Sequence, residues 1–436
     1  MKRFIKLLVL TSLLVFISCG ESNKEDSGKI TITFWHSFVP STIQALNELV
    51  EKFEKEHPDI TIKAQYIPSG DALIQKLITA VQSESAPDIS WLHSDYFEDL
   101  VEADAIHKMD DFIKGENGIS DEDINDIYPS LIQYSKWKGT LYSLPMEATN
   151  MALLYNKEMF RKAGLQGPPK TWDEFFEYSK KLTLDNNNDG KNDQTGFFVP
   201  IFPAAGPRGG WMVWQWMPFL WQAGGEYINA DQSQVTYNSE AGIAALTLWQ
   251  NIYRELDLRT FTSDFDVTFA SGRLAMAMDG SWSLPNYKSL FKNLDWGFAP
   301  LPAGPDKQAT IVGGEYLSIF KQSKHPEAAW KFVKWIIQPD VQAFWATRSG
   351  YLPIRHAALE VPEFQKYLEE NPNYKVFIDQ MEVGYAMQPI DYGGLQITQH
   401  VAEAIEKATI GNMDVRTSLN QSAAKSNALL KKSGKK

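Results

Sequence analysis

The stretch that decides the fold is residues 29–96, KITITFWHSFVPSTIQALNELVEKFEKEHPDITIKAQYIPSGDALIQKLITAVQSESAPDISWLHSDY. Ile30, Ile32 and Phe34 alternate with polar residues, which predicts a β-strand. Apolar residues then recur at helical spacing from position 43 to 53, and this helix must end before Pro58. The pattern repeats, predicting a strand, a helix and a strand at 60–66, 73–81 and 86–92. The β-α-β-α-β order predicts a parallel sheet with a ligand crevice at the carboxyl ends of its strands.

Length and charge set the next limits. The chain has 436 residues, 44% of them hydrophobic, with 54 acidic against 42 basic residues and a formal net charge of -12. At about 150 residues per domain this length predicts two or three domains, each able to bury its own core. The negative charge would repel a phosphate backbone, so nucleic acid is excluded as a general partner.

The N-terminus has the pattern of an export signal. Basic residues at 2, 3 and 6 precede the apolar run LLVLTSLLVFI at 7–17 and then Ser18 and Cys19. The run is shorter than the roughly 20 residues that cross a bilayer. Cys19 is the only cysteine, so no disulfide forms within the chain, and its place resembles a bacterial lipobox. We predict a lipoprotein signal peptide at 1–18, lipidation of Cys19 and a polar tether at 19–29; the alternative is a secretory signal that happens to contain a thiol.

Catalytic motifs were sought and not found. The sequence has no H-E-x-x-H, G-x-S-x-G, G-x-x-x-x-G-K-[ST] or C-x-x-C. Paired carboxylates for glycoside hydrolysis stay open, because 54 acidic residues offer many combinations. The sequence therefore favours a binding protein over an enzyme and predicts no required cofactor.

A polar loop between two predicted elements resembles the first half of a calcium loop. Oxygen-bearing side chains alternate around Gly190, and a helix-loop-helix calcium site would need a Glu where Gly196 stands. The alternative is an Asn/Asp turn that bonds its own backbone. The four residues of this possible structural calcium site are Asp185, Asn187, Asp189 and Asp193.

Aromatic and polar residues at predicted loop ends suggest a sugar site. A sugar ring has an apolar face and a belt of hydroxyls, so its site needs flat aromatic surfaces and directional polar groups. For any single tryptophan, core packing is the competing interpretation. Trp282 is the strongest aromatic candidate, because Gly280 and Ser281 before it indicate a turn. The candidates are Trp35, His36, Ser37, His93, Ser94, Asp95, Glu147, Trp211, Trp214, Ser281 and Trp282.

Motifs spread over the chain resemble those of the family 1 extracellular solute-binding proteins of bacterial ABC importers. They are ITFWHSF at 32–38, EKEHPDI at 54–60, APDI at 86–89, LPMEATNMALLYNKEMFRKAGL at 144–165, PPKTWDEF at 168–175, FASGRLAMAMDGSW at 269–282, IVGG at 311–314 and SGYLPI at 349–354. The resemblance implies an α/β, two-lobe periplasmic-binding-protein-like fold of type II with the ligand cleft between the lobes. It places crossings near Leu144, Met278 and Ile319. The implied N-terminal lobe is 29–144 plus 279–319, and the implied C-terminal lobe is 145–278 plus 320–436.

Within that family the chain is similar to the glycerol-3-phosphate and multiple-sugar branch. Glycerol-phosphate binders carry an Arg in a G-L-R motif, whereas this chain has Gln396 after Gly394 and Leu395. A glutamine cannot neutralise a phosphate dianion. By position, Gly314 and Tyr351 match ligand contacts of the family, and we add Glu315 and Tyr392 as further predicted contacts.

These observations predict a monomeric, lipid-anchored receptor, periplasmic or at the cell surface. It binds a neutral mono- or oligosaccharide and hands it unchanged to ABC permease subunits, touching the membrane only through its anchor. The alternatives are a binder of glycerol-3-phosphate or a related phosphoester, and a secreted glycosidase or lyase.

Overall fold

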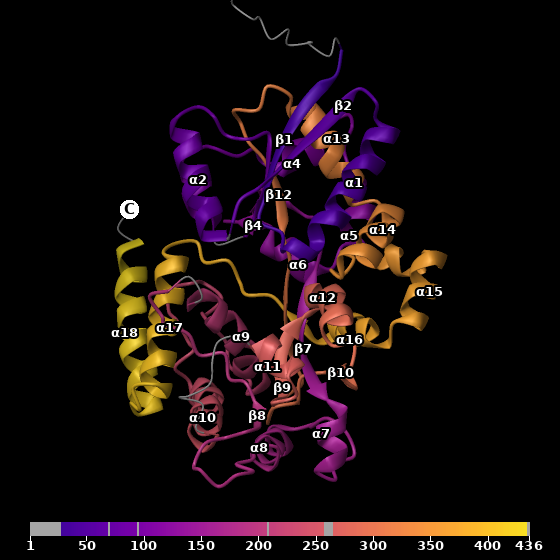
Figure 1. Ribbon diagram of the computed structural model, residues 1–436. Coiled ribbons are helices and arrows are strands. Elements are labelled where there is room, and N and C mark those ends of the chain that lie inside the picture. The colour runs from indigo at the N-terminus through magenta and orange to yellow at the C-terminus, as the bar shows by residue number, and fades with distance from the viewer. Residues whose placement is uncertain (1–27, 69, 94–95, 207–208, 257–264, 434–436) are drawn as a thin grey trace, which may run out of the picture.

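The chain forms two α/β lobes stacked end to end (Figure 1). The computed structural model describes residues 28–68, 70–93, 96–206, 209–256 and 265–433, and all statements below concern these residues. Each lobe is built on its own β-sheet with helices packed against it. The two-lobe α/β architecture predicted from the sequence is therefore confirmed.

The first lobe contains the sheet that residues 29–96 predict. Its strands are β1 (Ile30–His36), β2 (Ile60–Tyr66), β3 (Ile89–Leu92), β6 (Leu144–Pro145) and β12 (Tyr316–Ile319), in the order β2-β1-β3-β12-β6. Strands β2 and β3 lie parallel to β1 on either side of it, as a β-α-β-α-β order requires. Strand β12 enters antiparallel to β3 from far along the chain. Alternate residues of β1, among them Ile32 and Phe34, are fully buried, so one face of the strand supplies the core.

The second lobe is built around two antiparallel strands, β7 (Thr149–Asn156) and β9 (Leu274–Gly280). The other strands of its sheet are β8 (Thr195–Phe197), β10 (Trp296–Ala299), β11 (Thr310–Gly313) and β13 (Gly384–Tyr385), in the order β13-β11-β7-β9-β8 with β10 also paired to β7. Nearly every residue of β7 and β9 is buried, because helices cover both of their faces.

Helices complete both lobes (Figure 1). Those beside the first sheet are α1 (Ile43–Glu56), α2 (Gly70–Gln82), α3 (Phe97–Glu102), α4 (Met109–Ile113), α5 (Asp121–Asn125), α6 (Pro129–Tyr134), α13 (Pro326–Ile336) and α14 (Pro339–Ser349), with the hairpin β4 (Lys136–Trp137) and β5 (Thr140–Leu141). Those of the second lobe are α7 (Lys157–Lys162), α8 (Trp172–Lys181), α9 (Gly209–Gln222), α10 (Glu240–Glu255), α11 (Phe265–Ala270), α12 (Leu284–Leu290), α16 (Pro372–Gln380), α17 (Gly394–Thr409) and α18 (Val415–Ser433), and α15 (Pro362–Glu370) packs between α14 and α16. Short 3-10 turns are η1 (Pro40–Thr42), η4 (Ser281–Ser283), η5 (His356–Glu360) and η6 (Met381–Val383).

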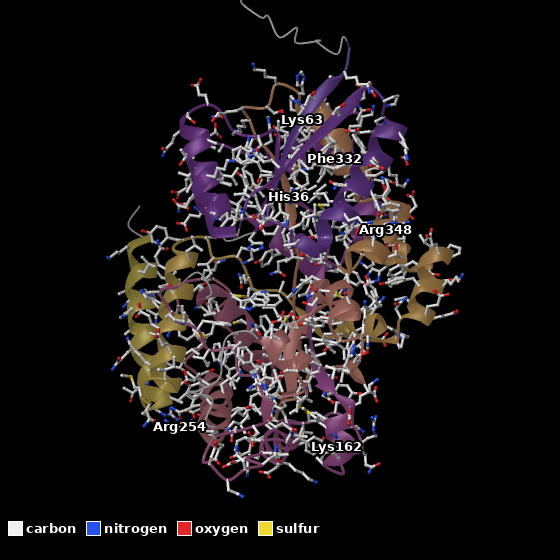
Figure 2. All side chains as sticks on the ribbon, viewed as in Figure 1. His36, Lys63, Lys162, Arg254, Phe332 and Arg348 are labelled. Atoms are coloured by element: carbon white, nitrogen blue, oxygen red, sulfur yellow. The ribbon has the colours of Figure 1, made fainter. Side chains whose placement is uncertain are left out.

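Side chains fill each lobe separately (Figure 2). Phe332 of α13 lies within the first lobe, where its ring meets those of Phe34 and Phe53 at centroid distances of 6.1 Å and 4.9 Å. Lys162 and Arg254 lie at the far end of the second lobe. No helix of the described residues is long and apolar enough to cross a membrane. The predicted signal peptide, Cys19 and almost all of the tether lie outside the described residues.

The predicted lobe boundaries need correction. The first crossing lies after β6, near Leu144 as expected, and a second joins β11 to β12. Met278 is not a crossing, because β9, β10 and β11 all stay in the second sheet, and only β12 of segment 279–319 joins the first. Segment 320–436 is also divided, since α13 and α14 pack on the first lobe. The third crossing follows α14, where Leu352 and Ala148 exchange backbone hydrogen bonds of 2.7 Å and 2.9 Å.

Candidate functional site

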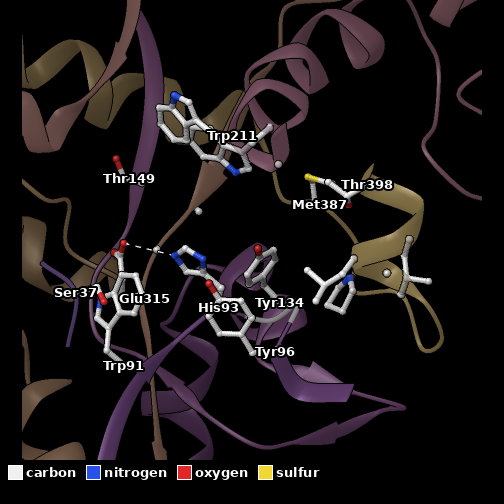
Figure 3. Close-up of a pocket in the computed structure, with 18 of the residues that line it drawn as sticks. Ser37, Trp91, His93, Tyr96, Tyr134, Thr149, Trp211, Glu315, Met387 and Thr398 are labelled. Carbon is white, nitrogen blue, oxygen red and sulfur yellow. Dashed lines mark ion pairs between the residues drawn. The ribbon is translucent and has the colours of Figure 1, made fainter. Parts of the chain in front are cut away.

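A cavity of about 630 Å³ lies between the two lobes and is lined from both (Figure 3). The first lobe and the crossing segments contribute Ser37, Val39, Trp91, His93, Tyr96, Glu98, Tyr134, Gly314, Glu315 and Tyr351. The second lobe contributes Thr149, Gly206, Gly210, Trp211, Trp214, Tyr227, Trp282, Gly313, Met387, Gln388, Pro389, Ile390, Gly394, Leu395, Thr398 and Gln399. A volume of this size falls within the range of small-molecule sites, roughly 300–1,000 Å³.

Three tryptophans form the wall of the second lobe. Trp211 and Trp214 lie three residues apart on α9, which places them on one face of the helix. Their rings stack with centroids 5.1 Å apart and planes inclined by 13°. The ring of Trp282 meets that of Trp211 edge-on at 5.6 Å and that of Trp214 at 6.3 Å. We refer to Trp211, Trp214 and Trp282 as the tryptophan wall.

A tight turn at the end of β9 positions Trp282. The indole lies back over Gly280, where an added Cβ would lie 1.8 Å from the ring, so only glycine fits. Asp279 is buried and accepts hydrogen bonds from the backbone N–H of Gly280 and from the hydroxyl of Tyr287. Burial raises the pKa of the Asp279 carboxyl to about 6. Ser281 hydrogen-bonds Thr149 of β7 at 3.1 Å, which ties the turn to the sheet.

Aromatic rings of the first lobe face this wall across the cavity. Trp91 is the penultimate residue of β3, and His93 and Tyr96 follow this strand at the carboxyl edge of the sheet. The His93 ring lies 4.7 Å from Trp91 and stacks on Tyr96 at 5.6 Å. Tyr134 of α6 stacks on Tyr316 at 5.2 Å and extends the same surface. The cavity is thus bounded by aromatic faces on two sides, with hydroxyl, imidazole and carboxyl groups between them.

Carboxylates supply the charge of the described cavity lining. No Lys or Arg occurs among the described lining residues. Glu315 lies at the crossing between β11 and β12, and its Oε1 is 3.9 Å from Nε2 of His93. Glu98 of α3 accepts the backbone N–H of Gly393 at 2.9 Å, a contact that joins the two lobes, and burial raises its pKa.

The structure brings together about half of the residues predicted from the sequence. Those that line the cavity are Ser37, His93, Trp211, Trp214, Trp282, Gly314, Glu315 and Tyr351. Ser94 and Asp95 lie outside the described residues. The predicted residues that do not line the cavity are Trp35, His36, Glu147, Ser281 and Tyr392.

The reasons for these errors differ. The Trp35 side chain lies on the α2 side of the sheet, where the Nζ atom of Lys76 is 4.2 Å from the centroid of the Trp35 ring. His36 is buried beside Phe34 and Phe38, and burial lowers its pKa to about 4, so it is a neutral core residue. Glu147 is fully buried and accepts the indole N–H of Trp345 at 2.6 Å, so it cannot touch a ligand directly.

Sequence reasoning missed other lining residues. Trp91 and Tyr134 belong to segments that looked like core, and no local signal distinguishes them. The segment 387–390, which carries no motif, also lines the cavity. The start of α17 lines it as well, at the place where the chain has Gly-Leu-Gln instead of G-L-R. Gly394 and Leu395 line it, whereas Gln396 is exposed and does not, so the glutamine at that position is weaker evidence against phosphate than the sequence suggested.

In the polar loop at 185–193, side-chain oxygens accept hydrogen bonds from backbone N–H groups of the same loop. Asp185 accepts the N–H groups of Asp189 and Gly190 at 3.2 Å and 2.9 Å, and Asp193 accepts that of Asn186 at 2.8 Å. The described residues hold no group of three or more His, Cys, Asp or Glu side chains that could hold a metal ion. The geometry matches the Asn/Asp turn, and calcium binding here stays a prediction.

Comparison with known proteins agrees with this architecture. A family model described as bacterial extracellular solute-binding protein matches residues 40–343. The sn-glycerol-3-phosphate-binding periplasmic protein UgpB of Pectobacterium atrosepticum is 26% identical over 420 residues, 92% of this chain and 91% of that one. A putative binding protein of Brucella abortus is 25% identical over 424 residues, 94% of this chain and 95% of that one. The solved structure of the cyclic alpha-maltosyl-1,6-maltose binding protein of Arthrobacter globiformis superposes with a TM-score of 0.79 and 25% identity, covering 93% of this chain and all of that one.

The family match covers well over half of the chain and includes parts of both lobes that enclose the cavity. The chain therefore belongs to the bacterial extracellular solute-binding proteins.

Proposed function

We propose that this protein binds a neutral mono- or oligosaccharide between its lobes and delivers it unchanged to the permease of an ABC importer. The observation that carries this proposal is the tryptophan wall facing a second aromatic surface in a cavity whose described lining has no Lys or Arg. Sugar rings stack their apolar faces on aromatic rings. The likeness to a maltosyl-maltose binding protein supports the same ligand class.

Polar groups between the aromatic surfaces would fix the orientation of the sugar. The Glu315 carboxylate accepts hydrogen bonds from hydroxyl groups, and the hydroxyls of Thr149 and Tyr134 can donate or accept. Closure of the lobes would exclude water and so strengthen these bonds. A permease can then recognise the closed form of the protein.

A thermal-shift screen over a library of neutral carbohydrates, with sugar phosphates and glycerophosphoesters included, tests the proposal. A ligand that binds only the folded state raises the melting temperature, and at one ligand concentration the shift is larger the tighter the ligand binds. We expect neutral oligosaccharides to give the largest shifts. Shifts confined to the phosphorylated compounds would refute the neutral-sugar proposal.

A glycerol-3-phosphate or glycerophosphoester ligand is the second candidate. The 26% identity to a glycerol-3-phosphate-binding protein favours it. Against it stands the charge of the cavity, since Glu98 and Glu315 would repel a phosphate dianion and no described lining cation would attract it.

We propose no catalytic activity. Incubating the pure protein with the oligosaccharides that bind it should yield no cleavage products. Accumulation of shorter sugars at a rate that scales with protein concentration would establish a glycosidase instead.

We also propose that the protein is attached to the membrane through a lipid on Cys19. In the same proposal the receptor acts outside the cytoplasm and is a monomer. The sequence before Cys19 supports it. Expression of the full chain should give a membrane-associated, acylated protein, and Cys19→Ser should release it to the aqueous fraction. Identical fractionation of both proteins would exclude a lipid anchor.

A further inference from the structure

Two glutamates from different lobe crossings lie next to each other: Glu315 lines the cavity, and Glu147 is fully buried. Glu147 lies between β6 and β7, and Glu315 lies between β11 and β12. The backbone N–H of Met146 donates to the carbonyl oxygen of Glu315 at 2.8 Å, which fixes the two crossings together. Gly314 packs so closely that an added Cβ would lie 2.1 Å from the carbonyl oxygen of Glu147. The positions of the two side chains are therefore set by the backbone of the two crossings.

The oxygens of this pair divide into partnered and unpartnered ones. Oε2 of Glu147 accepts the indole N–H of Trp345 at 2.6 Å, and Oε1 of Glu315 faces His93. The other two, Oε1 of Glu147 and Oε2 of Glu315, are buried and have no hydrogen-bond partner among the other described residues. Glu315 raises the pKa of Glu147 through its charge and through a side-chain hydrogen bond, so the two side chains are neighbours. A negative charge on Glu315 disfavours the ionised form of Glu147, which is fully buried.

The described surroundings offer the pair no Lys or Arg as a countercharge. The groups that face the pair are Trp345 of α14, Tyr351 of the third crossing, Tyr316 of β12 and His93 after β3. No described Lys or Arg forms an ion pair with either carboxyl. Burial, and after it the charge of Glu315, raises the pKa of Glu147 well above its usual value.

We propose that Glu147 and Glu315 hold one proton between them, with Glu147 donating it to Oε2 of Glu315, so that Oε1 of Glu315 is presented to the cavity as a fixed hydrogen-bond acceptor. Glu147 is then a positioning residue, and Glu315 is the residue that selects ligands carrying hydroxyl donors. The second part rests on the proposed function of the cavity, whereas the shared proton does not depend on any ligand.

Two variants of Glu147 distinguish a shared proton from a purely structural role of this residue. In Glu147→Gln the amide can still donate to Glu315 and accept from Trp345, but it has no proton to titrate. Glu147→Leu keeps comparable bulk and removes the donor. Asp279→Asn is the matched control, because Asp279 is another buried carboxyl of the same region but has other partners.

The first experiment uses ligand-free protein and infrared spectroscopy of the carboxyl carbonyl band near neutral pH. We expect one protonated carboxyl in the wild type that is lost in Glu147→Gln and retained in Asp279→Asn. As a second readout, the stability of Glu147→Gln relative to wild type should rise with pH above the usual Glu value, because the wild-type folded state binds a proton there that the unfolded state has lost. A wild-type protein without that band, and a stability difference that does not change with pH, would overturn the shared proton.

Binding of maltotriose, used as a neutral probe, tests the role of Glu315 as acceptor. We expect Glu147→Gln to keep its affinity within about threefold of wild type and Glu147→Leu to lose about tenfold or more, the cost of a lost bond to a charged group. Equal affinity in all three proteins would refute the positioning role. Failure of wild type to bind any neutral sugar would count against the proposed function alone, since the infrared result decides the shared proton separately.

Discussion

At the residue scale, the tryptophans of α9 show how one short segment serves two purposes. Trp216 and Trp221 are almost completely buried and belong to the core, whereas Trp211 and Trp214 face the cavity. The helical repeat separates Trp216 from Trp211, which lies five residues before it. Trp221 lies about two turns after Trp214 and is buried because other parts of the lobe cover it, among them Tyr385, whose ring stacks on it at 5.5 Å. The sequence identified the cluster, but only the packing of the helix shows which members are available to a ligand.

Trp282→Ala should weaken sugar binding by about tenfold, because an aromatic stacking contact contributes roughly 1 kcal/mol beyond its buried area. Calorimetry would measure the affinity, and the melting temperature would show that the fold is retained. Trp172→Phe is the control, since Trp172 bonds Gln222 away from the cavity. Unchanged affinity in Trp282→Ala would remove this residue from the site.

Asp279→Asn should alter the pH dependence of stability. The carboxyl has a folded-state pKa of about 6 against an ordinary 3.8, so between these values the folded state binds more protons than the unfolded state. The wild type therefore loses stability as pH rises through that window, and the asparagine variant does not lose this contribution. Denaturant unfolding at several pH values would measure it. A stability difference that is constant with pH would contradict the raised pKa.

The residues at the end of β1 show the limit of sequence reasoning about the site. The sequence placed Trp35, His36 and Ser37 together at the carboxyl end of a strand, and that position is correct. Side chains alternate between the faces of a strand, so neighbours cannot all face one cavity. Ser37 lines it, His36 enters the core and Trp35 faces α2, a division that depends on helices far along the chain.

At the scale of elements, local patterns located the strands but not the sheet that each strand joins. The alternating pattern predicted strands around Ile30–Phe34, at 60–66 and at 86–92, where β1, β2 and β3 lie. The predicted lobe boundary at Met278 was wrong because the chain, after the turn at Gly280, returns through α12 to the same sheet. No local sequence pattern indicates this return. Sheet membership depends on contacts between residues more than a hundred positions apart, such as those of β3 with β12.

The crossing at Gly314 should tolerate no side chain. In Gly314→Ala the new Cβ would meet the backbone of Glu147, which cannot move without separating the crossings. We expect a loss of about 2 kcal/mol in unfolding free energy, typical of overpacking. Gly167→Ala is the matched control, because no atom lies within 4 Å of its added Cβ. Equal stability of the two variants would show that the backbone of this crossing can move aside for a side chain, contrary to the structure.

At the scale of the whole molecule, the lobes touch across the mouth of the cavity. The bond from Gly393 to Glu98 joins α17 of the second lobe to α3 of the first, so the structure represents a form in which the lobes are close. If this is the ligand-bound form, saturating sugar should slow hydrogen exchange of the backbone amides in 387–394. Mass spectrometry would measure the exchange. A bound sugar that leaves exchange in this segment unchanged would contradict closure on the ligand.

We propose that the cavity between the lobes is a site for an uncharged sugar. A pair of calorimetric titrations tests this, one with a neutral oligosaccharide selected by the thermal-shift screen and one with the phosphate ester of the same sugar. We expect the neutral sugar to bind more tightly, because Glu98 and Glu315 repel the dianion. Tighter binding of the phosphate ester would contradict it.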